Sequence, residues 1–163
     1  ASAAGFSASV EPVIAMREEA LAAHRLYVAE LRHPVEVRAE ENHLLPWLSR
    51  RIGTTLRAPD LTKYDFKLLG GRLLPGVTAP AALLMYENTS GERVTLYSTP
   101  LKTARTSFRY QQIDKFASIH WVAENYGWVV CGPADKPREL GRTVAFDLLA
   151  KGAAAIIETS RPA

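Results

Sequence analysis

Between Phe66 and Cys131 the chain consists of apolar runs of strand length, separated by short segments of turn-forming residues. Asn88–Gly91 has the composition of a hairpin turn, and Glu124–Asn125 leaves two residues to connect the last two runs. Strands joined by such turns pair as antiparallel neighbours. The sequence therefore predicts an antiparallel meander sheet of about five to six strands, at 66–74, 81–87, 93–99, 106–111, 117–123 and 126–131.

Two adjacent glycines, Gly70 and Gly71, interrupt the first of these runs. A phosphate-binding loop needs backbone N–H groups that converge at the start of a helix. Here the chain continues as a strand and turns at Pro75–Gly76. We therefore interpret the pair as a β-bulge, or as a place where another backbone or a large side chain comes close.

Helical periodicity precedes the strands. After a flexible lead-in at Ala1–Val10, apolar residues recur at three- and four-residue steps from Pro12 to Arg32, which predicts a long amphipathic helix. His33–Pro34 ends this helix, because the residue before a proline avoids the helical conformation. A second, shorter helix is expected to start between Glu41 and His43 and to end before Gly53.

A third helix is predicted from Asp135 to Gly152, after the last strand. The resulting fold class is α+β, an antiparallel meander sheet with helices covering one of its faces. We divide the chain into a lead-in with its amphipathic helix at 1–34, a single α+β domain at 35–152 and a C-terminal tail at 153–163.

Composition and charge exclude several classes. The 163 residues are 47% hydrophobic and 23% charged, as in an ordinary globular domain. The net charge is +3, and basic and acidic residues are interspersed, so we expect no nucleic-acid partner. One cysteine excludes an internal disulfide, and no run of about 18 apolar residues could span a bilayer. The chain resembles a mature soluble chain or a fragment.

The histidines do not have the spacing of a metal site. His24, His33 and His43 are separated by nine and ten residues, and His120 lies far downstream. Two imidazoles that share one metal ion on a local element are commonly two or four residues apart. We therefore assign no metal ligand.

His120 and Cys131 fall on adjacent predicted strands. Together with Asp114 or Glu124 they define an alternative hypothesis, a small metal-binding or thiol-dependent enzyme domain. Cys131, however, ends an apolar strand, where a free cysteine is usually a packing residue. The chain also carries none of the common nucleophile, metalloprotease or phosphate-loop motifs. We assign no catalytic residue and no cofactor, and we expect no enzymatic activity.

Seven blocks stand in a recognisable order: HRLYVAELRHPVEV, HLLPWLSRRIG, LRAPDL, FKLLGGRLLPG, PAALLMYEN, GERVTLYSTP and IHWVAENYGWVVCGP. In order and spacing they resemble the extracytoplasmic part of proteobacterial transmembrane anti-sigma factors, which hold an extracytoplasmic-function sigma factor at the inner membrane. The resemblance runs from about His24 to Leu149.

The resemblance implies a location and a set of partners. In that family a small cytoplasmic domain binds the sigma factor, one membrane-spanning helix follows, and the rest lies in the periplasm. This chain would be the periplasmic sensor part, with 12–32 as a juxtamembrane helix. Its partner would be a periplasmic signalling protein, protease or ligand, and it would meet the sigma factor only through the missing cytoplasmic domain. Pairing of the amphipathic helix with a second copy would give a homodimer.

Overall fold

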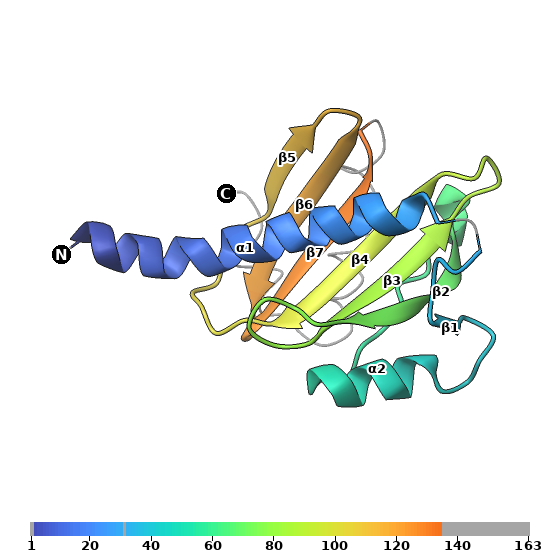
Figure 1. The fold of residues 1–163 in the computed structure, drawn as a ribbon, viewed down its shortest axis with the longest axis horizontal. Coiled ribbons are helices and arrows are strands. Elements are labelled where there is room, and N and C mark those ends of the chain that lie inside the picture. The colour runs from blue at the N-terminus through green and yellow to red at the C-terminus, as the bar shows by residue number, and fades with distance from the viewer. Residues whose placement is uncertain (1, 31, 135–163) are drawn as a thin grey trace.

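The computed structural model describes residues 2–30 and 32–134 as two α-helices, one short 3₁₀ helix and seven strands (Figure 1). The predicted helix at 135–152 and the tail at 153–163 lie outside the described residues. In chain order, the elements are α1 (Ser2–Val28), β1 (Val37–Arg38), α2 (Leu44–Ile52), the 3₁₀ helix Thr62–Tyr64, β2 (Lys67–Leu74), β3 (Ala81–Glu87), β4 (Arg93–Pro100), β5 (Arg109–Ile113), β6 (Phe116–Ala123) and β7 (Tyr126–Pro133).

All seven strands form one antiparallel sheet in the order β1-β2-β3-β4-β7-β6-β5. The α+β class with a meander-like sheet is confirmed. The predicted five to six strands are too few, because the short segment Val37–Arg38 pairs with Gly71 and Gly70 at one edge. The last three strands form a second meander, which joins the first where β7 pairs with β4. The prediction for β5 is displaced by a few residues, since it begins at Arg109 and not at Thr106.

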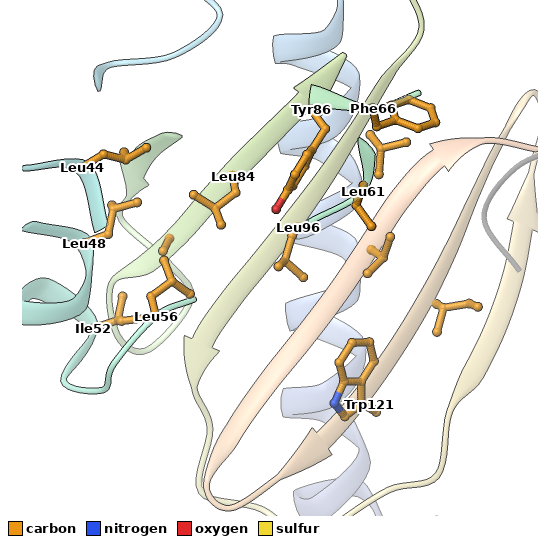
Figure 2. Packing of buried hydrophobic residues seen from close by; sticks show 14 of the residues in the cluster. Leu44, Leu48, Ile52, Leu56, Leu61, Phe66, Leu84, Tyr86, Leu96 and Trp121 are labelled. Carbon is orange, nitrogen blue, oxygen red and sulfur yellow. The ribbon is translucent and has the colours of Figure 1, made fainter. Parts of the chain in front are cut away.

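The two helices lie on opposite faces of the sheet, so the prediction that helices cover a single face is wrong. The central strands are apolar on both sides, and each side therefore needs a cover. Leu44, Leu48 and Ile52 of α2 point into a core on one face that includes Leu84 and Leu96 (Figure 2). On the other face, α1 packs against a second core. The sheet separates the two cores.

Helix α1 begins earlier and ends earlier than predicted. It includes the small-residue segment expected to be a flexible lead-in, which is rich in alanine, the strongest helix former. It ends at Val28 because Arg93 of β4 reaches its last turn. The Arg93 guanidinium donates hydrogen bonds to the backbone oxygens of Tyr27 and Val28 at 3.2 Å and of Glu30 at 2.6 Å. A residue far away in the sequence therefore caps the helix.

The interpretation of Gly70 and Gly71 as a bulge is confirmed. The pairing of β2 with β3 shifts register between Leu68 and Gly70, and Gly70 has a φ of 153°. A Cβ atom on Gly70 would lie 2.1 Å from the backbone oxygen of Val37, and one on Gly71 would lie 3.0 Å from Cδ1 of Leu48. The two glycines thus let β1 and α2 approach the sheet closely.

Candidate functional site

Among the described residues, the interface between α1 and the sheet contains several buried polar side chains, including His24, Thr95 and His120. Helix α1 crosses β6, β7 and β4 (Figure 1). Its contact with β7 is close, because a Cβ atom on Gly127 would lie 2.1 Å from Sδ of Met16. The apolar part of this interface consists of Val13, Met16, Ala20, Leu21 and Ala23 on α1 with Leu83, Tyr97, Leu101, Val122, Val129 and Cys131 below them.

Two polar pairs cross this interface. The Tyr97 hydroxyl donates a hydrogen bond to the carboxylate of Glu19 at 2.5 Å, and burial together with this bond raises the pKa of Tyr97. Nδ1 of His24 lies 2.8 Å from the hydroxyl oxygen of Thr95, and its ring packs edge-on against Phe116. Burial, assisted by the charge of Arg25, lowers the pKa of His24 to about 4. His24 is therefore neutral at pH 7. The hydrogen bonds that hold the helix to the sheet can be broken, and the groups that form them can be titrated.

Cys131 and His120 do lie on adjacent strands, β7 and β6, and on the same face, but they are not opposite each other. Ser118 pairs with Cys131, and His120 pairs with Val129. The thiol is fully buried, and burial raises its pKa to about 12 against the smaller opposing effect of a hydrogen bond with Thr95. It is a protonated packing group at neutral pH, and a thiol nucleophile must ionise.

The carboxylates proposed to complete this group are elsewhere. Asp114 and Glu124 are exposed in turns, where both have positive φ angles. Asp114 lies 3.9 Å from the guanidinium of Arg25, and Nδ1 of His120 has no hydrogen-bond partner among the described residues. Within the described part of the chain, no three His, Cys, Asp or Glu side chains gather in a way that could hold a metal ion.

His120 instead belongs to a cavity of about 550 Å³ between the middle of α1, the segment that precedes β5, and strands β5 and β6. Burial is the main cause that lowers the pKa of His120 to about 4, and the charges of Arg17 and Arg109 add to this effect. This cavity could hardly be predicted from the sequence, because it is assembled from three separate segments. The lining residues are Val13, Ile14, Arg17, Thr103, Ala104, Thr106, Arg109, Tyr110, Gln111 and His120.

Comparisons with protein-family models, with curated proteins and with solved structures found no match. Within residues 2–30 and 32–134, no helix is long and apolar enough to cross a membrane. A functional proposal therefore rests on the seven sequence blocks and on the geometry of the interface between α1 and the sheet.

Proposed function

We propose that this chain is the periplasmic sensing domain of a membrane-bound anti-sigma factor that controls an extracytoplasmic-function sigma factor. It would act without catalysis. A periplasmic ligand, protease or signalling protein changes how α1 lies on the sheet, and the helix passes that change to the membrane span that the resemblance implies. The sigma factor is met only through the cytoplasmic domain of the complete protein.

The observation that carries this proposal is the construction of the interface between α1 and the sheet. The first turns of α1 extend past the edge of the sheet (Figure 1), so the helix can connect the domain to a segment outside it. Its docked half is held by the pairs Glu19–Tyr97 and His24–Thr95, and its contact surface includes the small side chains of Ala20 and Ala23. A contact made this way can have two arrangements that differ by a few kcal/mol, which a regulatory switch requires.

The second core makes such movement tolerable. Leu48, Ile52 and their neighbours cover the opposite face of the sheet, and Tyr86 there donates a hydrogen bond to the backbone oxygen of Pro59 at 2.9 Å (Figure 2). Because the sheet separates this core from α1, the sheet keeps one covered face when the helix shifts. Local opening of one element at less than the global free energy of unfolding is common in folded domains.

The alternative of a metal-binding or thiol-dependent enzyme receives no support from the arrangement of its residues. His120 and Cys131 point to different surroundings, the first to a cavity with two arginines and the second to Thr95. We keep the sensor function as the proposal.

A homodimer through α1 remains a prediction. Val13, Leu21 and His24 of α1 are buried against the sheet. Ile14 and Leu26 stay 41% and 64% exposed and leave apolar surface for a second copy. Sedimentation of the chain at tens of micromolar should show a dimer, and a single monomeric species at that concentration would end this part of the proposal.

The sensor function can be tested with a matched pair of substitutions in the complete membrane protein. Tyr97→Phe removes the hydroxyl that bonds Glu19 on α1, and Tyr126→Phe removes a hydroxyl that bonds the backbone oxygen of Ile52 on α2 at 3.2 Å. A hydrogen bond to a charged group is worth about 1.5–3 kcal/mol, enough to shift a two-state equilibrium about tenfold or more.

We expect Tyr97→Phe to change transcription from a sigma-dependent reporter several-fold, and Tyr126→Phe to leave it close to wild type. Equal reporter activity in all three strains, at equal protein levels, would refute a signalling role for the docking of α1. A reporter that responds equally to both variants would attribute the effect to general destabilisation and would also refute it.

A further inference from the structure

The cavity beside α1 contains three buried polar atoms without a hydrogen-bond partner in the described structure. They are Nε of Arg17, Oε1 of Gln111 and Nδ1 of His120. They come from α1, β5 and β6, and all three residues line the same cavity. His120 is only 5% exposed, so bulk water does little to satisfy its ring. Because an unsatisfied buried polar atom costs free energy, three such atoms around one space suggest that something polar binds there.

The charges around the cavity favour an anion. Arg17 and Arg109 line it together with His120, and none of its lining residues is acidic. Among the described residues, Arg17 pairs with the carboxylate of Glu18, whose oxygen lies 3.1 Å from a terminal nitrogen of the guanidinium; the Glu18 side chain is 57% exposed and does not line the cavity. The planar donors of a guanidinium suit a carboxylate particularly well.

The remaining groups add two further requirements. Oε1 of Gln111 is an acceptor, so it calls for a donor such as an amide N–H or a hydroxyl on the ligand. Val13, Ile14 and Ala104 supply an apolar wall. The volume of about 550 Å³ lies within the range of about 300–1,000 Å³ that is usual for small-molecule sites.

We propose that this cavity binds a small amphiphilic carboxylate: a molecule with one carboxylate held by Arg17 and Arg109, an amide or hydroxyl donor near Gln111, and an apolar body. The binding stands on the cavity itself. Its use as a signal rests on the proposed function, since a ligand that bridges α1 to β5 and β6 favours the docked arrangement of the helix.

N-octanoylglycine is a suitable probe, because it combines a carboxylate, an amide N–H and an apolar chain. Its methyl ester keeps the amide and the chain and lacks the charge. We expect titration of the 163-residue chain with N-octanoylglycine, followed by ¹H–¹⁵N correlation spectra, to give saturable shifts at the lining residues on α1, β5 and β6. The methyl ester should bind about tenfold more weakly or worse, because it loses a charge-assisted hydrogen bond.

Arg109→Gln tests the site without removing a buried residue, since this arginine is exposed on the edge strand β5. We expect it to weaken binding of N-octanoylglycine about tenfold. The matched control is Arg51→Gln, an exposed arginine of α2 on the other face, which should bind like wild type.

Any of three results would overturn the binding proposal: no saturable shifts, shifts that map away from the cavity, or equal binding of acid and ester. Equal weakening by both arginine variants would do the same, because it would show only a general effect of charge. The reporter experiment with Tyr97→Phe is independent of these measurements. Binding can therefore fail while the sensor function stands, and the sensor function can fail while binding stands.

Discussion

His24 should make the stability of the domain depend on pH in a range where few other groups titrate. Burial holds its pKa at about 4 in the folded chain, and an unfolded histidine has the ordinary value of 6.5. A folded pKa below the unfolded one means that the unfolded chain takes up the proton first as the pH falls. The contribution of His24 is therefore complete above about pH 6.5 and is lost progressively between pH 6.5 and pH 4.

The magnitude follows from the size of the shift. One pH unit corresponds to about 1.4 kcal/mol, so lowering the pH from 7 to 5 should cost about 2 kcal/mol through His24 alone. His120, with a folded pKa also near 4, should add a similar loss. His24 is hydrogen-bonded to Thr95 across the contact between α1 and the sheet, so the cost of charging its buried ring acts at this interface.

Urea denaturation followed by tryptophan fluorescence at pH 7 and pH 5 measures this loss. His24→Asn keeps a polar atom near the position of Nδ1 and cannot be protonated, so its free energy of unfolding should fall by about 2 kcal/mol less than that of wild type. Carboxylates titrate in both proteins, and their effect cancels in the comparison. His43→Asn, at an exposed position, is the control and should show the wild-type response. The same loss in wild type and His24→Asn would refute the reasoning.

Three further substitutions or measurements test the packing. Gly70→Val should destabilise the domain by about 3 kcal/mol, because its Cβ atom would meet the backbone oxygen of Val37. Gly91→Asn, in open space and with a residue that tolerates the left-handed φ of 82°, should cost much less in the same urea titration. Gly127→Val should displace Met16, cost about 1–3 kcal/mol and increase proteolysis within α1; unchanged protection of the helix would contradict this. Cys131 should react with a disulfide reagent at pH 8 only after denaturation, and rapid labelling of the folded chain would contradict its burial.

Much of the fold can be read from short-range rules. The strand at Ala81–Glu87 has the predicted bounds, and the turn at Glu124–Asn125 has two positive φ angles, as its tight connection requires. The end of α2 at Gly53, with a φ of 80°, was also predicted. In each case the deciding interaction lies within a few residues of the chain, so the local composition contains the necessary information.

The candidate site was only partly predictable. The sequence correctly placed His120 and Cys131 on adjacent strands, because each strand has a clear apolar pattern. It could not place Arg17 and Arg109 beside His120, since the three residues meet only after α1 has docked on the sheet. The only local indication was that Arg109 and Gln111 lie two residues apart on the short strand β5 and therefore share one face of the sheet.

The amino-acid sequence by itself determined most of the strands, the tight turns between them and the glycine bulge. The tertiary structure decided where α1 ends, because Arg93 caps it from a distant strand, and decided that β7 pairs with β4. It also decided that the helices cover opposite faces. The physical reason is the range of the interactions: turn geometry and side-chain periodicity act between neighbours, whereas caps, strand order and the cavity depend on contacts between segments far apart in the chain.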